Sequence, residues 1–353
     1  MRLFTFVLLI ICLTFCRREE VFLPHLVSEG MVLQSNDTVV IEGYAHPFAK
    51  VNISFLGRQY EVWAGWNKHW QARIPTGDAG GPFVMNINGQ IIKDIYIGDV
   101  WLLSGQSNMA YSMDSVMDLY REIRDTTIIP AIHHFRVSTW TPIDGPKDDN
   151  LGTQWENLSP EAVGDWSAIG YFFARRMYEK SGRPQGIINA SQGGSDITGW
   201  MSREALNDCM PRYIERLDKW PSDSCTFNAP TGFFNGMIAP MKNWKISGVV
   251  WYQGENNVDR PDEYATLLSS LIGSWRRIFW KKLPFIVIQL HDYQDPDTTW
   301  FPGWEKIRQS QCSVAQIMPH VTLIETAGLS ESENLHPHHK QEVGECVADA
   351  LLK

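Results

Sequence analysis

The period of the hydrophobic pattern changes near residue 98, and this change constrains the fold more than any other feature of the sequence. From residue 21 to residue 97, short runs such as Lys50–Phe55 alternate apolar and polar residues between turn-forming stretches. After residue 98 the runs become continuously apolar, as in Gly248–Tyr252, and helical patterns such as 264–279 separate them. Strands that are apolar on both faces need helices on both sides of their sheet. The sequence therefore predicts an antiparallel β-sandwich accessory domain over residues 21–97 and a doubly wound α/β domain over residues 98–353.

The N-terminus has the pattern of a signal peptide over residues 1–20. Arg2 precedes an apolar stretch from residue 3 to residue 16, which ends at Arg17 and Arg18. A membrane-spanning helix needs about 20 apolar residues, so this stretch predicts export to the periplasm or the exterior and no membrane span. Cys16 offers a site for a lipid anchor as an alternative, although Phe15 stands where a lipoprotein signal has a small residue.

Charge and cysteine content narrow the possible partners. The net charge of −9 argues against a nucleic-acid-binding surface, which needs a basic stripe. Four cysteines remain after the predicted signal peptide, and no CxxC pair suggests a structural zinc site. Cys209 and Cys225 flank a loop-like stretch and form the more plausible disulfide among the three possible pairings.

A serine follows the first strand of the second domain, where a helix is predicted to begin. Ligands of doubly wound sheets bind beyond the carboxyl ends of the strands. The Ser107 hydroxyl would therefore face the crevice, and the amides of the first helical turn would face an oxyanion. On position alone, Ser107 is either a nucleophile or an ordinary helix cap.

Three further strand ends carry residues that suit a reaction at this serine. The paired glycines at the first of these strand ends either let the backbone approach a ligand or form a plain turn. The carboxylate at the second is either a base or a structural acceptor. The histidines at the third titrate in the range of a general base. The dense histidine cluster also admits a metal site, although a proline interrupts its spacing. These residues are Gly193 and Gly194, then Gln253 and Glu255, and finally His336, His338 and His339.

Five strings in sequence order match one known family. They are 30–34, 98–109, 234–240, 248–255, and Leu335-His336-Pro337 followed by Lys340 and 343–344. Together they resemble the sialate O-acetylesterase family of the SGNH hydrolases over nearly the whole mature chain. The resemblance implies a flavodoxin-like three-layer α/β/α domain behind the β-sandwich. It also implies hydrolysis of acetyl esters on sialic acid or a related acetylated carbohydrate, with no metal or organic cofactor.

The resemblance also implies roles for individual residues. Ser107 is the nucleophile, and His336 is its base ahead of His338 and His339. The amides of Ser107 and Gly194 and the side chain of Gln253 are expected to hold the oxyanion. Residues expected on the substrate side of the site are Gln106, Asn108, Trp200 and Glu255, with Trp251 or Tyr252 as further aromatics near the sugar.

One departure concerns the acid of the triad. SGNH enzymes often carry an aspartate three residues before the histidine, where this chain has Glu333, and many members carry one two residues before it, where this chain has Asn334. Either Glu333 completes the triad or a backbone carbonyl orients the histidine, because the requirement is an acceptor for the second imidazole proton.

Two other functions fit parts of the sequence. A non-catalytic carbohydrate-binding protein on the same fold would explain the altered acid position. A glycosidase would use Glu255 and Glu333 as its carboxylate pair, but it would leave the serine motif without a role.

Overall fold

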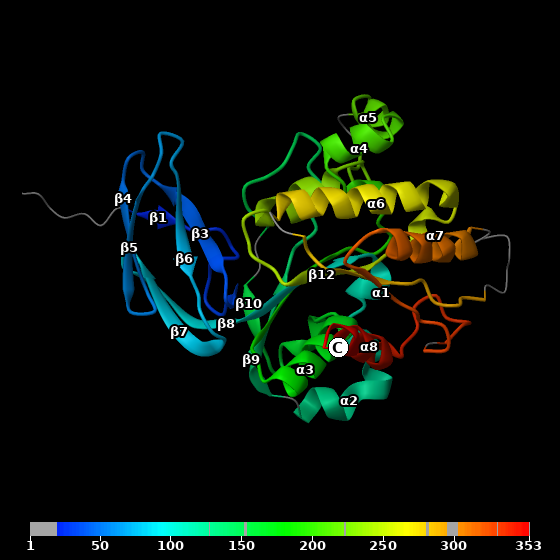
Figure 1. Cartoon of the computed structure of the whole chain (residues 1–353), viewed down its shortest axis with the longest axis horizontal. Helices are drawn as coiled ribbons and strands as arrows, with labels where there is room; N and C mark the ends of the chain where they lie inside the picture. The colour runs from blue at the N-terminus through cyan, green and yellow to red at the C-terminus, as the bar shows by residue number, and fades with distance from the viewer. Residues whose placement is uncertain are drawn as a thin grey trace, which may run out of the picture.

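The structure, a computed structural model, describes residues 20–126, 128–151, 154–221, 224–279, 282–294, 303–329 and 331–352. The predicted signal peptide, with Cys16, lies outside these residues except at its last position. The described part forms a small β unit and a larger α/β unit, side by side in Figure 1. A single long strand, β8 (Gln90–Gly105), belongs to the sheets of both units and joins them.

The β unit consists of two small sheets whose strands alternate buried and exposed residues. One sheet has the antiparallel order β1-β3-β6, and the other pairs β5 with β4, β4 with β7 and β7 with β8, with β2 parallel to β8. Apolar residues of both sheets are buried, among them Ile41, Ile53 and Trp70. The strands are β1 (Val21–Phe22), β2 (Val32–Gln34), β3 (Thr38–Ala45), β4 (Lys50–Phe55), β5 (Arg58–Trp63), β6 (His69–Pro75) and β7 (Gly80–Ile87).

The α/β unit is built on a central sheet with the order β10-β9-β11-β8-β12-β13-β14. All neighbouring strands are parallel except β10, which is antiparallel to β9. Every residue of β12 and β13 is buried, as the continuous apolar runs predict. The strands are β9 (Ile129–Arg136), β10 (Trp155–Leu158), β11 (Gln185–Ser191), β12 (Gly248–Tyr252), β13 (Phe285–Ile288) and β14 (Val321–Ile324).

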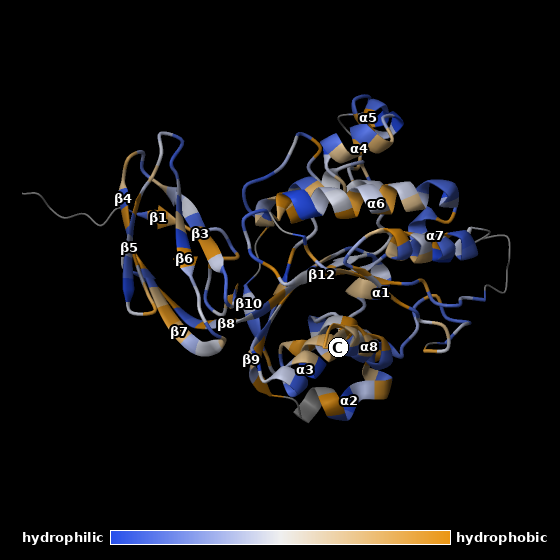
Figure 2. Ribbon diagram, in the orientation of Figure 1, coloured by the Kyte–Doolittle hydropathy of each residue, from blue (hydrophilic) through white to orange (hydrophobic). Residues whose placement is uncertain are grey.

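Helices cover both faces of this sheet and complete the predicted three-layer α/β/α architecture (Figure 1). One face carries α2 (Met117–Thr126), α3 (Ala168–Ser181) and α8 (Lys340–Leu351), and the other carries α4 (Arg203–Cys209), α5 (Arg212–Leu217), α6 (Pro261–Ile278) and α7 (Trp304–Ile317). In Figure 2 the helices carry hydrophobic and hydrophilic residues together, as helices with one face on a sheet do. No helix of the described residues is long and apolar enough to cross a membrane.

The helix that is predicted to begin at Ser107 is interrupted. Helix α1 (Ser107–Ala110) ends after one turn, and α2 begins only at Met117. Between them the Tyr111 carbonyl accepts the Ala168 amide at 2.8 Å, and Ser112 forms a β-bridge with Ser167. These bonds to the start of α3 replace the helical bonds, so the chain leaves the helix there. The remaining short helices are η1 (Asp114–Val116), η2 (Val163–Asp165), η3 (Ile197–Trp200), η4 (Phe234–Ile238), η5 (Ala239–Met241) and η6 (Glu255–Asn257).

The predicted disulfide between Cys209 and Cys225 is not formed. No disulfide joins any of the four cysteines in the described part of the chain. Cys209 lies half-buried at the end of α4, where its Sγ contacts the Leu206 carbonyl, whereas Cys225 is exposed.

We expect Gly105→Ala to lower the free energy of unfolding by about 3 kcal/mol or more. Gly105 ends β8 with φ of +135°, and a Cβ atom there would lie 2.0 Å from the Tyr252 carbonyl oxygen of β12. Both the backbone conformation and the close approach of the two strands exclude a side chain. Urea unfolding followed by circular dichroism measures the loss.

Gly182→Ala is the matched control, because Gly182 caps α3 at φ of +67° and an added Cβ would meet no atom within 4 Å. It carries only the conformational cost, about 1 kcal/mol. Equal losses in the two variants would contradict the strand contact as the cause.

Candidate active site

Two polar side chains meet at the carboxyl edge of the central sheet. Ser107 is the first residue of α1, directly beyond β8, and His336 lies in the loop between β14 and α8. The Ser107 Oγ and the His336 Nε2 are 2.9 Å apart, although 229 residues separate them in sequence. Both side chains are partly exposed, so a ligand can reach them. The structure thus brings together the predicted nucleophile and the predicted base.

The environment of His336 favours its neutral form. Burial, and secondly the positive charge of Lys340, lower the pKa of the imidazole. A histidine with a lowered pKa stays unprotonated into the weakly acidic range and can accept a proton there. The Tyr111 ring stacks on the imidazole with centroids 5.4 Å apart and planes 7° apart, which fixes the plane of the ring.

The loop that carries His336 is held by Asn334 instead of by the predicted acid. The Asn334 Oδ1 accepts the His336 amide at 3.0 Å, and the Asn334 carbonyl bonds His291 Nε2 at 3.0 Å. Glu333 is exposed, and no hydrogen bond or ion pair between described residues joins it to His336. The structure therefore gives Glu333 no contact with the imidazole, and its role as the third triad member stays a prediction.

The other two histidines of the cluster have different contacts. The His338 amide donates to Glu331 Oε2 at 3.0 Å, and His339 Nε2 lies 3.9 Å from Glu331 Oε1. The ring of His338 contacts Tyr111, with centroids 6.0 Å apart. No group of three potential metal ligands occurs among the residues that the structure describes.

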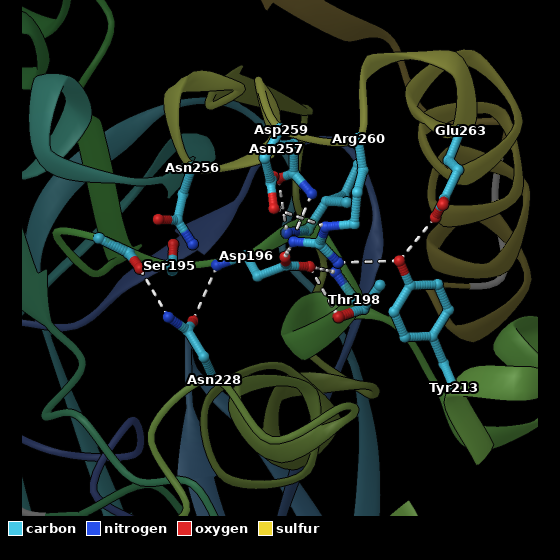
Figure 3. Close-up of polar contacts among 12 residues, drawn as sticks. Ser195, Asp196, Thr198, Tyr213, Asn228, Asn256, Asn257, Asp259, Arg260 and Glu263 are labelled. Carbon is cyan, nitrogen blue, oxygen red and sulfur yellow. Dashed lines mark hydrogen bonds and ion pairs between the residues drawn. The ribbon is translucent and has the colours of Figure 1, made fainter. Parts of the chain in front are cut away.

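The glycine turn after β11 lies against the serine. A Cβ atom on Gly193 would sit 3.5 Å from the Ser107 Cβ, and Gly194 adopts φ of +68°. Asn228 clamps this turn at two points: its Nδ2 donates to the Gly194 carbonyl at 2.7 Å, and its Oδ1 accepts the Asp196 amide at 2.8 Å (Figure 3). These two bonds fix the turn that lies beside Ser107.

The predicted oxyanion donor Gln253 is occupied elsewhere. Its side chain is fully buried, and its Nε2 donates to the Ser195 carbonyl at 3.0 Å and to Asn257 Oδ1 at 2.7 Å. Its Oε1 accepts the Tyr264 hydroxyl at 3.0 Å. Because both amide hydrogens hold the protein backbone and Asn257, Gln253 supports the glycine turn and does not offer a hydrogen to the substrate.

A second polar network surrounds Asp196, which follows the glycine turn after Ser195 (Figure 3). Asp196 accepts the amide and the hydroxyl of Thr198 at 2.8 and 2.7 Å, pairs with Arg260 and accepts Asn257 Nδ2 at 3.2 Å. Burial of Arg260 opposes its charge, but the Asp196 carboxylate dominates and raises the pKa of the guanidinium. Tyr213 links Arg260 to α6, because its hydroxyl accepts from Arg260 at 2.9 Å and donates to Glu263 at 2.6 Å.

The residues predicted on the substrate side are all buried. Their side chains face the protein because they hold the turns around the serine: Gln106 Oε1 accepts the Asn256 amide at 3.2 Å, and Trp200 Nε1 donates to the Ser195 hydroxyl at 2.9 Å. The exposed fractions are 3% for Gln106, 0% for Asn108, 0% for Trp200 and 6% for Glu255. Trp251 and Tyr252 are also buried. The structure thus shows these residues supporting the turns around the serine, and their contact with a substrate stays a prediction.

Comparison with known proteins identifies the family of this site. The profile of the family described as carbohydrate esterase, sialic acid-specific acetylesterase, matches residues 97–353. The chain belongs to this acetylesterase family. Its members are ester hydrolases, which accords with a serine and a histidine in contact at the sheet edge.

Three relatives show how far the similarity extends. The rat sialate O-acetylesterase is 27% identical over 90% of this chain and 70% of its own length. The human sialate O-acetylesterase is 29% identical over 72% of this chain, which spans about half of the human protein (52%). A crystal structure of a carbohydrate acetylesterase from Xanthomonas citri superposes with a TM-score of 0.79 at 28% identity, covering 93% of this chain and 74% of the other.

Asn228, the anchoring role of Asn334, and the pair Asp196–Arg260 were not predicted from the sequence. Asn228 stands in an irregular stretch whose pattern predicts neither strand nor helix, and its φ of +59° is a conformation that asparagine tolerates. A sequence signal existed only for Asp196, which follows the glycine turn directly.

We expect Asn228→Gly to lower kcat for an aryl acetate roughly tenfold, because the glycine turn loses two hydrogen bonds that fix it beside Ser107. Glycine keeps the left-handed backbone, so the variant tests the side chain alone. Steady-state kinetics and thermal unfolding on the same preparation measure both effects. Wild-type kcat in a folded Asn228→Gly protein would show that the clamp is not needed for reactivity.

Proposed function

We propose that this chain removes O-acetyl groups from a carbohydrate by a serine acyl-enzyme mechanism. The observation that carries the proposal is the 2.9 Å contact between the Ser107 Oγ and the His336 Nε2, in a chain that belongs to the acetylesterase family. A serine hydroxyl is a weak nucleophile unless a base lies within hydrogen-bond reach, and this distance meets that requirement.

In the first half of the reaction the Ser107 oxygen attacks the acetyl carbonyl while His336 Nε2 takes the hydroxyl proton. The resulting oxyanion is held by the amides of Ser107, at the start of α1, and of Gly194, in the glycine turn. Loss of one such donor typically lowers turnover about 10²–10³-fold. The tetrahedral intermediate collapses, the sugar oxygen leaves with the proton from His336, and the acetyl group stays on Ser107.

In the second half, water attacks the acetyl-enzyme. His336 takes a proton from this water, acetate leaves, and the proton returns to the Ser107 oxygen. The imidazole must keep its Nε2 directed at the serine throughout. Stacking on Tyr111 and the Asn334 bond to the His336 amide support this orientation, in place of the carboxylate of Glu333.

The two rival functions are less well supported. Glu255 is 6% exposed and bound by Asn108 at 2.7 Å, so it does not face a glycosidic bond as one of a carboxylate pair with exposed Glu333 would. A purely carbohydrate-binding protein has no need for a serine–histidine contact.

The substrate is an acetylated glycan. Relatives are sialate O-acetylesterases from rat and human and a carbohydrate acetylesterase from Xanthomonas citri, which supports acetylated sialic acid or another acetylated carbohydrate such as xylan.

We also propose export to the periplasm or exterior through residues 1–20, on the sequence pattern of Arg2 and the apolar stretch after it. The N-terminal mass of the protein recovered from its native compartment tests this, and an intact Met1 would refute it.

Acetate release by the purified chain from acetylated sialic acid and acetylated xylan, side by side, tests the function. We expect release from at least one, and a loss of roughly 10³-fold or more in both Ser107→Ala and His336→Ala, because each removes one half of the proton-transfer pair. Ser112→Ala, in the segment after α1, is the control and should keep its activity. Full activity in Ser107→Ala would refute the proposal.

A further inference from the structure

A chain of buried polar side chains lies directly behind the Ser107–His336 pair. Lys340 Nζ donates to Asn108 Oδ1 at 2.7 Å, and Asn108 Nδ2 donates to Glu255 Oε1 at 2.7 Å and to the Leu335 carbonyl at 3.1 Å. Asn108 directly follows the serine in sequence, and Leu335 directly precedes the histidine. One side chain thus ties together the two backbone segments that carry the reacting groups.

The location of Lys340 is unfavourable for a lysine in two respects. It is 2% exposed, so its ammonium has lost its hydration, and burial lowers the pKa of the amine to about 7. It is also the first residue of α8, where the helix dipole disfavours a positive charge. Burial likewise raises the pKa of Glu255 to about 7. A residue that violates both burial and dipole preferences is expected where function requires it.

Lys340 is also coupled to the histidine through an aromatic ring. Its Nζ lies 5.2 Å from the centroid of Tyr111, and the same ring stacks on His336 at 5.4 Å. Tyr111 therefore contacts both the ammonium and the imidazole. The positive charge of Lys340 disfavours a second positive charge on His336.

We propose that Lys340 is a positioning residue for the reaction. Through Asn108 it fixes the nucleophile beside the histidine loop, and its charge keeps His336 a neutral base. This inference rests on the proposed function of Ser107 and His336. Lys340 does not touch the substrate, so its effect falls on turnover and on the pH at which turnover is lost, and not on substrate affinity.

Other ionisable groups surround this arrangement, and the carboxylates closest to Lys340 oppose its effect. The buried Glu255 and the half-buried Glu331 both stabilise the ammonium electrostatically. When Lys340 is replaced, the carboxyl groups of Glu255 and Glu331 remain, either ionised or neutral. In both cases His336 loses a neighbouring positive charge. The remaining groups are Glu333, His338 and His339 on the histidine loop, His291 and Asp292 after β13, Glu342 in the first turn of α8 and Tyr120 of α2.

Two substitutions separate charge from hydrogen bonding. Lys340→Met removes both, whereas Lys340→Gln removes the charge and keeps a donor for Asn108. The control Lys306→Gln removes the same charge from an exposed lysine of α7 that pairs with Asp262 at 3.1 Å. The titration of His336 is followed by NMR of the full chain with labelled histidine, its resonance assigned with His336→Gln, beside kcat and KM on an aryl acetate across pH.

We expect both Lys340 variants to move the His336 titration midpoint, and with it the acidic limb of kcat/KM, to higher pH. A protonated imidazole cannot accept the serine proton, so the loss of activity is greatest at low pH. At high pH we expect Lys340→Met to lower kcat about tenfold with KM unchanged, and Lys340→Gln to lower it less. Lys306→Gln should leave both the midpoint and kcat unchanged.

A His336 midpoint that stays in place or falls in folded Lys340→Gln overturns the inference, and so does a rise in KM without a fall in kcat. If Lys340→Met does not fold, the result for Lys340→Gln alone tests the inference. The NMR titration of His336 does not require turnover. A wild-type chain that hydrolyses no acetyl ester would refute the proposed function, but the His336 midpoint would still test the role of Lys340.

Discussion

The hydrogen bond between Ser107 and His336 joins two segments that are 229 residues apart, and neither segment holds its position alone. Ser107 is placed by β8, whose last residue, Gly105, lies opposite Ser191 of β11 and Tyr252 of β12. His336 is placed by a loop that spans from β14 to α8. The contact therefore depends on the neighbours of β8 in the sheet and on the packing of α8 against α3.

Buried polar groups provide the precision that the sheet alone does not. Asn108 reaches from the nucleophile to the histidine loop, Gln253 and Asn228 hold the glycine turn, and Asp196 with Arg260 braces that turn from behind. Such groups are costly to bury unless each polar atom has a partner. Most of these atoms are partnered, whereas the second oxygen of Glu255 has no partner among the described residues. Hydrogen bonds to the backbone thus hold the segments of the site in place, whereas burial disfavours the charged forms of Glu255 and Lys340.

Much of this architecture could be predicted from the sequence. The change of hydrophobic period predicted the two units, and the strand ends, with the family resemblance, predicted that Ser107 and His336 would meet. Strands β9 and β10 were missed, because β9 contains Pro130 and two histidines that look solvent-exposed in a sequence but are buried here. A polar residue buried by its tertiary context gives no periodic signal.

The direction of side chains could not be predicted. Asn108 follows Ser107 in α1, where successive side chains point about 100° apart, and its side chain is buried although Ser107 is partly exposed. Gln106 precedes the helix in an extended conformation and is also buried. The same limit applies to Trp200 and Glu255, whose place in a motif indicated proximity to the site but not which face they occupy. For Glu333 and Asn334 the sequence also could not show which side chain contacts the His336 segment, and in the structure it is Asn334, which accepts the His336 amide.

If Ser107 is the nucleophile and His336 activates it, a fluorophosphonate should label this serine, because such reagents react preferentially with a serine that a neighbouring base activates. Labelling of the purified chain followed by peptide mass spectrometry measures this. We expect one label per chain on the peptide that contains Ser107, complete loss of esterase activity in the labelled protein, and almost no labelling of His336→Ala. A label on another residue, or an unlabelled chain that still hydrolyses acetyl esters, would contradict it.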